Sequence, residues 1–292
     1  GETEDHQIQI TALNGGIQIG AVSGRAREQQ VISIPNPQLW SPDSPHLYDL
    51  QIEVREHGQL IDKIESYFGM RKFSLQPDKL GRLQLCLNNK QLFHSGPLDQ
   101  GYWPDGLHTP PSEAAMRYDI EYLREIGCNM LRKHIKVEPA RFYYDCDRLG
   151  MIVWQDMPTG GKPVGDILSF LAIMFGRLSR RDDRWYWRAG RGDQDSRDNY
   201  WQELRGMVDH LHNFSCIGMW VPFNEAWGQF DANQVADWLA GYDPTRPVDH
   251  ASGWFDQGGG DFRSIHTYFK ALAPENPDDK RGVILSEFGG YA

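Results

Sequence analysis

Short apolar segments alternate with helical periods from about residue 76 onward, and this alternation limits the fold more than any other feature. Met116, Ile120 and Leu123, for example, recur at helical spacing between Ser112, a residue type that caps helices, and Gly127, a residue type that ends them. Strands that alternate with helices form parallel sheets, and a (β/α)8 TIM barrel is the most economical arrangement. The seven predicted strands are 92–95, 128–132, 151–155, 217–223, 246–250, 262–266 and 283–286.

The barrel predicted over residues 76–292 is small for this fold. It includes a long excursion over residues 159–199 that is rich in Gly, Arg and Asp, with one short helix predicted at 167–175. Only seven strands fit before Ala292. We therefore expect a C-terminally truncated barrel that lacks its eighth βα unit and has two open edges.

The first 75 residues have a different pattern, in which apolar and polar residues alternate one by one. This alternation, at 8–10, 17–19 and 50–54, predicts strands with one solvated face. Asn14-Gly15-Gly16 is a hairpin turn whose residues tolerate positive φ, and His57-Gly58 separates a second pair of strands. Residues 1–75 are therefore predicted to form a small antiparallel β-sandwich of about five strands.

Composition excludes several classes of protein. With 30 Lys and Arg against 40 Asp and Glu, the net charge is −10, which argues against nucleic acid as a partner. No apolar run is long enough for a membrane helix, so no membrane association is expected. The start GETEDHQ has neither the basic region nor the apolar stretch of a signal peptide, so none is expected there. The four cysteines, Cys86, Cys128, Cys146 and Cys216, form no CxxC pair and are expected to be buried thiols.

Two acids directly end apolar strands of the predicted barrel. Glu225 follows residues 220–223 and Glu287 follows residues 283–285. Barrel active sites lie at the C-terminal ends of the strands, and strands four and seven of an eight-strand ring face each other across the mouth. Glycoside hydrolysis needs two carboxyl groups that converge in this way. A helix cap or a salt bridge is the alternative role for either acid alone.

Several segments resemble glycoside hydrolase family 2. Residues 220–229 (WVPFNEAWGQ) are similar to the family's acid/base motif, and residues 284–290 (ILSEFGG) to its nucleophile strand. Further matches are 68–71 (FGMR), 147–150 (DRLG), 154–156 (WQD) and 265–268 (IHTY). Residues 36–48 (NPQLWSPDSPHLY) resemble the family's immunoglobulin-like domain. The resemblance covers about residue 30 to the end and implies an immunoglobulin-like sandwich over 1–75 followed by the TIM barrel.

The resemblance also implies roles for individual residues. Glu225 would be the general acid/base and Glu287 the nucleophile, with Asn224 bound to the sugar 2-hydroxyl. Tyr268 would hold the nucleophile, and Arg132 would keep it ionised. The other substrate-binding candidates are His266, His134, Asp99, Trp103, Trp227 and Trp254.

Burial of Glu225 against Trp227, or the charge of Glu287, would keep Glu225 protonated near neutral pH. The tryptophans could stack on sugar faces, with ordinary packing as the alternative. One departure concerns His134, because the family often has Arg-x-x-His where this chain has Arg132-Lys133-His134. The family's N-terminal jelly-roll domain and eighth barrel strand are not visible in the sequence.

No metal site and no cofactor are expected. His210 and His212 lie two apart on a predicted helix and point in different directions. A metal-dependent hydrolase built on His250, His266, Asp249 and Asp156 is disfavoured, because no HxH motif starts the barrel. A cluster in the excursion could approach an anionic substrate or could be an ordinary solvated loop; it comprises Arg181, Arg184, Trp185, Trp187 and Arg188.

Two functional hypotheses remain from the sequence. The first is a retaining β-glycosidase acting on terminal β-linkages of oligo- or polysaccharides, most similar to a β-galactosidase, with carbohydrate as its partner. The second is a non-catalytic, carbohydrate-binding or inactive piece of such an enzyme. The sequence does not indicate the sugar, the linkage, the compartment or the oligomeric state.

Overall fold

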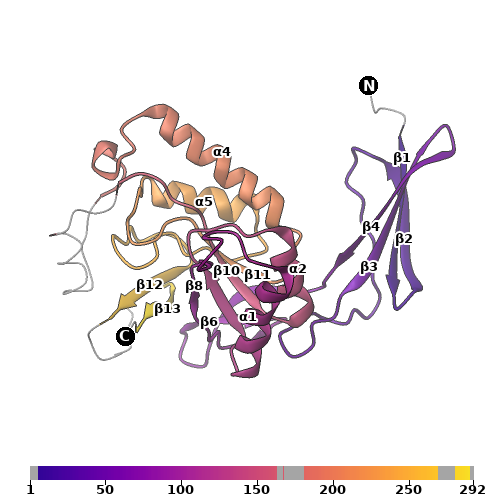
Figure 1. Ribbon diagram of the computed structural model, residues 1–292, viewed down its shortest axis with the longest axis horizontal. Coiled ribbons are helices and arrows are strands. Elements are labelled where there is room, and N and C mark those ends of the chain that lie inside the picture. The colour runs from indigo at the N-terminus through magenta and orange to yellow at the C-terminus, as the bar shows by residue number, and fades with distance from the viewer. Residues whose placement is uncertain (1–5, 163–166, 168–180, 269–279, 290–292) are drawn as a thin grey trace.

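The computed structural model describes residues 6–162, 167, 181–268 and 280–289, and its N-terminal part is a single antiparallel sheet (Figure 1). The strands are β1 (Gln7–Asn14), β2 (Ile17–Arg25), β3 (Tyr48–Glu56) and β4 (Gln59–Phe68), in the order β2-β1-β3-β4. Both predicted turns are confirmed, since Gly15, Gly16, His57 and Gly58 all have positive φ.

The two-sheet packing predicted for this part is not seen among its described strands. The irregular segment that contains Ile32 and Ile34 packs against β2, since a Cβ added to Gly20 would meet Ile32 at 2.7 Å and Ile34 at 3.5 Å. Glycine at this position therefore lets the backbone of the irregular segment approach the sheet closely.

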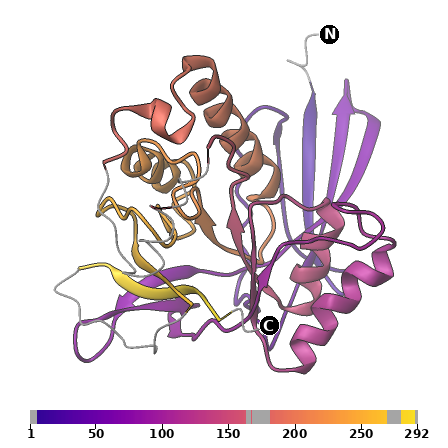
Figure 2. The same cartoon turned by 60° about the vertical axis from the view of Figure 1, so that its left-hand side comes forward.

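A short antiparallel hairpin follows, with β5 (Phe73–Pro77), β6 (Leu83–Leu87) and β7 (Lys90–Gln91). The domain boundary predicted after residue 75 falls inside β5, which pairs along its whole length with β6. Figure 2 shows this hairpin beside the C-terminal strands, and β6 contacts β13. The hairpin therefore packs with the barrel part of the chain.

The remaining strands alternate with helices and pair in parallel, as predicted. One sheet has the order β11-β10-β9-β8, and β12 pairs with β13. The strands are β8 (Leu98–Asp99), β9 (Met130–Lys133), β10 (Ile152–Asp156), β11 (Ile217–Val221), β12 (Phe262–Thr267) and β13 (Gly282–Phe288). The helices are α1 (Glu113–Glu125), α2 (Ala140–Leu149), α4 (Gln194–Leu211) and α5 (Ala232–Tyr242), with a 3-10 turn η1 (Tyr186–Ala189) before α4.

Local signals placed the helix ends correctly. The Ser112 hydroxyl accepts a hydrogen bond from the backbone N–H of Ala115 at 3.1 Å, which caps α1 as predicted. Gly150 ends α2 with φ 76°, and a Cβ there would lie 2.4 Å from the carbonyl oxygen of Pro42. Only glycine satisfies both the conformation and the close approach of the N-terminal part.

Two predicted strands are wrong in position or extent, and prolines explain both. Residues 92–95 are not a strand; pairing with β9 begins only at Leu98, because Pro97 has no N–H to donate. The predicted strand 246–250 is reduced to isolated parallel bridges, Trp220 to Val248 and Asn224 to Ser252. Pro247 and Pro222 each remove one donor from that ladder.

Other predictions for the barrel have mixed outcomes. The helix predicted at 167–175 lies outside the described residues, except for residue 167. The missing eighth βα unit stays a prediction. All four cysteines are free, and Cys128 is only partly buried. Among the helices of the described ranges, none is long and apolar enough to cross a membrane.

One buried aspartate joins the N-terminal sheet to the barrel. Asp147 of α2 accepts hydrogen bonds from the hydroxyl of Tyr67 on β4 at 2.9 Å and from the N–H of Cys216 at 2.5 Å. The indole N–H of Trp40 donates to the Asp147 carbonyl oxygen at 2.7 Å. Burial raises the pKa of Asp147 to about 6, more than these hydrogen bonds lower it. Asp147 therefore joins the two parts through three hydrogen bonds.

A cavity of about 530 Å³ lies between the hairpin, β9 and β13. Much of its lining is apolar and includes Leu85, Met130 and Ile284, while Arg132 and Glu287 border it as polar residues. The C-terminal ends of β9 and β13 therefore adjoin an open apolar space.

Candidate active site

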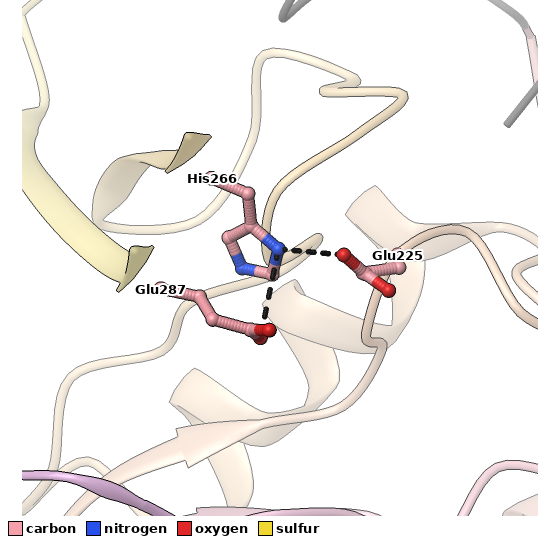
Figure 3. Close-up of side chains that lie close together, drawn as sticks. All are labelled: Glu225, His266 and Glu287. Carbon is pink, nitrogen blue, oxygen red and sulfur yellow. Dashed lines mark hydrogen bonds and ion pairs between the residues drawn. The ribbon is translucent and has the colours of Figure 1, made fainter. Parts of the chain in front are cut away.

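The two glutamates singled out in the sequence converge on one imidazole (Figure 3). Glu225 lies in the loop after β11 and Glu287 lies near the end of β13. One carboxylate oxygen from each and a ring nitrogen of His266 all lie within 4.8 Å of one another. Their side chains are 18% and 15% exposed, so both remain accessible from the mouth of the barrel.

Glu225 lies in a strained backbone turn. Its φ is 50° and that of Ala226 is 62°, in the left-handed region that residues with a Cβ seldom adopt. The Glu225 N–H donates to the Ser252 carbonyl oxygen at 2.9 Å, and the Trp227 N–H donates to the Asn224 carbonyl oxygen at 3.0 Å. Such strain is common at functional sites, and here it turns a carboxylate inward at the end of β11.

His266 has one tautomer that satisfies its neighbours. Its Nε2 lies 3.4 Å from a guanidinium nitrogen of Arg132, which can only donate, and 3.1 Å from the Ser252 hydroxyl. Nε2 is therefore the acceptor and Nδ1 carries the proton. Nδ1 lies 3.1 Å from Oε1 of Glu225 and 3.7 Å from Oε2 of Glu287. The buried ring thus donates its hydrogen bond to Glu225.

The Tyr268 hydroxyl lies between the two carboxylates. It is 2.7 Å from Oε1 of Glu225 and 2.7 Å from Oε1 of Glu287. A phenol has a single proton, so it can donate to one carboxylate at a time. When it donates to Glu287, its oxygen can accept from a protonated Glu225. Burial, followed by the charges and hydrogen bonds of both glutamates, raises the pKa of Tyr268 and keeps its proton in place.

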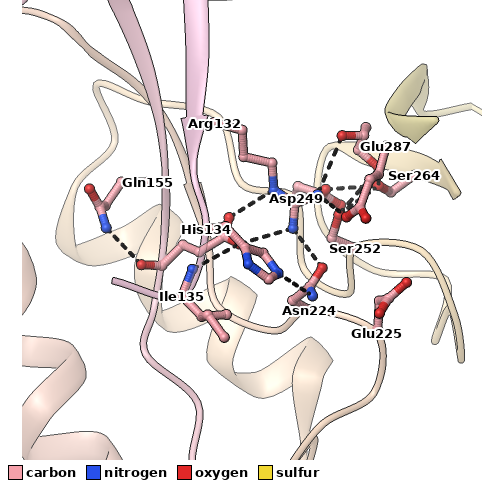
Figure 4. Close-up of polar contacts among 12 residues, drawn as sticks. Arg132, His134, Ile135, Gln155, Asn224, Glu225, Asp249, Ser252, Ser264 and Glu287 are labelled. Carbon is pink, nitrogen blue, oxygen red and sulfur yellow. Dashed lines mark hydrogen bonds and ion pairs between the residues drawn. The ribbon is translucent and has the colours of Figure 1, made fainter. Parts of the chain in front are cut away.

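Arg132 orients several groups at once (Figure 4). Its guanidinium donates two hydrogen bonds to Asp156, from Nε at 2.9 Å and from Nη2 at 3.0 Å. Nη2 also donates to Oδ1 of Asn224 at 2.7 Å, and Nη1 lies 3.6 Å from Oε2 of Glu287. Arg132 is almost fully buried, so this positive charge is poorly screened from Glu287.

His134 lies in the site, although its spacing departs from the family pattern. Asn224 accepts from Arg132 through its oxygen, so its amide nitrogen faces His134, 2.9 Å from Nε2. Burial lowers the pKa of His134 more than the charge of Asp156 raises it, which favours the neutral ring that can accept this bond.

Sequence reasoning missed a buried hydroxyl network below His266. Ser264 lies on β12, Ser286 lies on β13, and Ser252 forms an isolated bridge with Asn224; the three hydroxyls contact one another. Ser264 also donates to Asp249 at 2.9 Å (Figure 4). Burial raises the pKa of Asp249, although Arg132 lowers it. The serines give no sequence signal, whereas Asp249 lies near the end of a predicted strand.

The pKa expected for Glu225 was wrong in direction. Burial does raise the pKa of this carboxyl, as the sequence suggested. Hydrogen bonds from His266 and Tyr268, together with the charge of Arg132, outweigh burial and leave the pKa below its ordinary value. The sequence could not indicate this result, because the donors come from other strands.

The remaining predicted substrate-binding residues differ in their surroundings. Asp99 accepts a hydrogen bond from the buried Lys133 at 2.7 Å, and Trp103 lines a small depression beside this ion pair. Trp227 is 43% exposed beside Glu225, which leaves it free to contact a ligand. Trp254 is buried, and its indole N–H has no hydrogen-bond partner among the described residues.

The ligand atoms of the site decide whether it could hold a metal ion. Among the residues that the structure describes, Glu225, His266 and Glu287 together offer three ligand atoms. The imidazole nitrogen nearest the carboxylates is Nδ1, which bears the proton, so its lone pair is not available to a cation. The cluster therefore does not fit a metal site in this tautomer.

Comparison with known proteins places the chain in a family. Residues 2–71 match the model described as glycosyl hydrolases family 2, and residues 81–275 match the model of that family's TIM barrel domain. A putative beta-glucuronidase of Formosa agariphila is 28% identical over 67% of this chain and 20% of its own length. A beta-galactosidase of Vibrio cholerae is 26% identical over 86% of this chain and 24% of its own length. The chain thus spans about a fifth to a quarter of these relatives.

Solved structures share the fold at low identity. A beta-D-glucuronidase of Dictyoglomus thermophilum has a TM-score of 0.76 and 18% identity, covering 98% of this chain and 50% of that one. A beta-glycosidase of Bacteroides vulgatus has a TM-score of 0.65 and 21% identity, covering 92% and 31%. An immunoglobulin-like domain followed by a TIM barrel domain accounts for both models and for this likeness. The chain belongs to family 2 of the glycosyl hydrolases.

Proposed function

We propose that the protein containing this chain is a retaining β-glycosidase, with β-galactosides as its first candidate substrates. The proximity of the two carboxylates carries the proposal, since an oxygen of Glu225 and one of Glu287 lie within 4.8 Å of each other. Retaining enzymes separate their carboxyl groups by about 5–5.5 Å, and inverting enzymes need about 6.5–9.5 Å to admit a water. The observed proximity favours direct attack by a carboxylate.

Glu287 is the proposed nucleophile. Its Oε2 is buried and accepts no hydrogen bond from the described residues, while Arg132 lies 3.6 Å away. An ionised oxygen without a donor is free to attack the anomeric carbon. Attack forms the glycosyl ester bond as the bond to the leaving oxygen breaks, and Glu225 supplies the proton to that oxygen.

Tyr268 provides a way for Glu225 to hold that proton despite its low pKa. When the phenol donates to Glu287, its oxygen can accept a hydrogen bond from protonated Glu225 across 2.7 Å. When Glu287 becomes an ester, its negative charge disappears and the phenol can turn to ionised Glu225. Glu225 is then ready to take a proton from the attacking water.

The two roles are separated by azide rescue of the full-length gene product. Glu287→Ala leaves space for azide to attack the substrate directly, so the expected product is a glycosyl azide of inverted configuration. Glu225→Ala keeps the first step for substrates with good leaving groups, so azide should attack the ester and give the retained configuration. The opposite pair of products would reverse the roles, and two fully active variants would refute the site.

The sugar is identified by a panel of nitrophenyl β-glycosides that includes galactoside, glucuronide and mannoside. The non-catalytic alternative predicts no turnover on any of them. The proximity of the two carboxylates and of Arg132 to Glu287 supports the catalytic proposal instead.

A further inference from the structure

An exposed group of cations and aromatic rings lies on the excursion before α4, at the short turn to the left of α4 in Figure 1. We call Arg184, Trp185, Trp187 and Arg188 the arginine–tryptophan patch. Trp185 is 51% exposed and Trp187 is 63% exposed. The guanidinium carbons of Arg184 and Arg188 lie 4.4 and 4.7 Å from the centroid of the Trp185 ring. Arg188 also lies 5.4 Å from the Trp187 centroid, so two largely exposed indoles and two exposed guanidinium groups gather at this surface.

The two arginines of the patch have no carboxylate within ion-pair distance in the described ranges. The nearby Asp183 is bound by Arg181 instead. Unpaired guanidinium groups beside each other are unusual on a chain whose net charge is −10, because acidic side chains are plentiful. The patch is therefore a local positive region on an acidic protein.

The backbone holds the patch in a fixed shape. Trp185 has φ 54°, in the left-handed region that a bulky residue rarely adopts. The hydroxyl of Tyr186, the next residue, bonds both carboxylate oxygens of Asp231 at 3.0 and 3.1 Å. Strain of this kind persists where surrounding contacts fix the conformation, and it is frequent at ligand sites.

The same turn is attached to the loop that carries Glu225. Arg191 donates to the carbonyl oxygen of Gly228 at 3.2 Å, three residues after Glu225. Trp185 also lines a small depression together with Gln229 and Phe255, which follow two barrel strands. The patch therefore lies at the same mouth of the barrel as the catalytic candidates.

We propose that the arginine–tryptophan patch binds sugar rings of a uronic-acid polysaccharide whose chain end enters the candidate site. The C–H faces of sugars suit an exposed indole, and a guanidinium binds a carboxylate with two parallel hydrogen bonds. A neutral glycan would form no ion pair with the two arginines of the patch. The net negative charge of the chain would repel an acidic glycan from the rest of its surface. That the polysaccharide is also a substrate rests on the proposed glycosidase function. Its binding at the patch is independent of that function.

Affinity electrophoresis in native gels tests the binding. The gels contain polygalacturonate or its fully methyl-esterified form, which has the same backbone without charge. We expect polygalacturonate to retard the protein and the methyl-esterified polymer not to retard it. Arg184→Gln with Arg188→Gln should weaken binding about 5- to 30-fold, since each lost cation contact contributes roughly 0.5–1 kcal/mol. Trp187→Ala should also weaken it, without altering the strained residue.

Arg205→Gln is the matched control. Arg205 of α4 also stacks on aromatic rings, 5.7 Å from the Trp238 centroid and 5.8 Å from that of Tyr242, away from the mouth. This variant should bind like the unaltered protein. Equal retardation in both polymers, or unchanged retardation in the arginine variants, would overturn the proposal. Unchanged retardation with Trp187→Ala would overturn the stacking of a sugar on that ring.

Hydrolysis of nitrophenyl β-glycosides is measured in parallel. The patch variants should leave it unchanged, because none of the altered residues contacts either glutamate. Retardation without hydrolysis would refute the glycosidase function and leave the patch supported. Hydrolysis without retardation would refute the patch alone.

Discussion

Replacing Gly253 by alanine should displace the imidazole that links the two glutamates. Gly253 has φ 87°, and an added Cβ would lie 2.5 Å from Nδ1 and 2.6 Å from Cγ of His266. Ordinary contacts begin at 3.4 Å, so the ring would have to move by about 0.9 Å. Ser252 and Arg132 contact its other nitrogen at 3.1 and 3.4 Å and limit that movement.

The size of the effect follows from the hydrogen bond that is lost. His266 donates to the Glu225 carboxylate at 3.1 Å, and a bond to a charged group contributes about 1.5–3 kcal/mol. If the same energy is lost from the transition state, kcat/KM falls by roughly 10- to 150-fold. The left-handed backbone adds about 1–2 kcal/mol of lost stability.

The pH dependence should change in a defined direction. The hydrogen bond from His266 lowers the pKa of Glu225, so its loss raises that pKa. A general acid loses its proton as the pH rises through its pKa. The basic limb of the pH–rate profile should therefore move to higher pH in Gly253→Ala.

Gly258→Ala is the matched control. Gly258 has φ 81°, nearly the same as Gly253, but an added Cβ meets nothing within 4 Å. Thermal unfolding should show a loss of stability in both variants, larger in Gly253→Ala because of the contact with His266, while only Gly253→Ala loses activity and shifts its pH profile. If the two variants have the same kinetics, the assigned role of His266 is wrong.

Three further outcomes are expected. The full-length protein should show a bell-shaped pH dependence of kcat/KM, since one carboxyl must be ionised and the other protonated; a flat profile would count against the assignment. Arg132→Lys should reduce kcat at least about tenfold although the charge is kept, because lysine cannot reproduce the two bonds to Asp156; unchanged turnover would contradict this. Asp147 has a pKa raised to about 6, so its contribution to stability falls as the pH rises from about 4 to 6. Asp147→Asn should remove about 3 kcal/mol of that pH dependence in the free energy of unfolding, and identical pH profiles of the two proteins would refute it.

Features that depend on neighbouring residues could be predicted from the sequence. The Asn14–Gly16 turn, the Ser112 cap and the Gly150 helix end follow from φ preferences and short-range hydrogen bonds. The alternation of strands and helices likewise predicted the parallel barrel. The wrongly predicted strands at 92–95 and 246–250 also have a local cause, since Pro97 and Pro247 each lack the N–H that strand pairing needs.

The position of each acid at a strand end also came from the sequence. Glu225 and Glu287 could be recognised because each follows an apolar strand and because the surrounding residues resemble a known family. Asp99 has the same kind of position, yet the structure pairs it with Lys133. A strand end therefore indicates where a side chain starts, and not which partner it finds.

Only the tertiary structure decided the chemistry of the site. Ser252, Ser264 and Ser286 meet beside His266 because β12 pairs with β13 and residues 248–252 lie next to β12, and no sequence pattern marks them. The pKa of Glu225 is lowered because hydrogen bonds from His266 and Tyr268, together with the charge of Arg132, outweigh burial. That balance depends on contacts between residues that lie far apart in the chain, and on distances of a few tenths of an ångström. Local propensities set the elements of the barrel, whereas strand packing set the positions of the protons and charges.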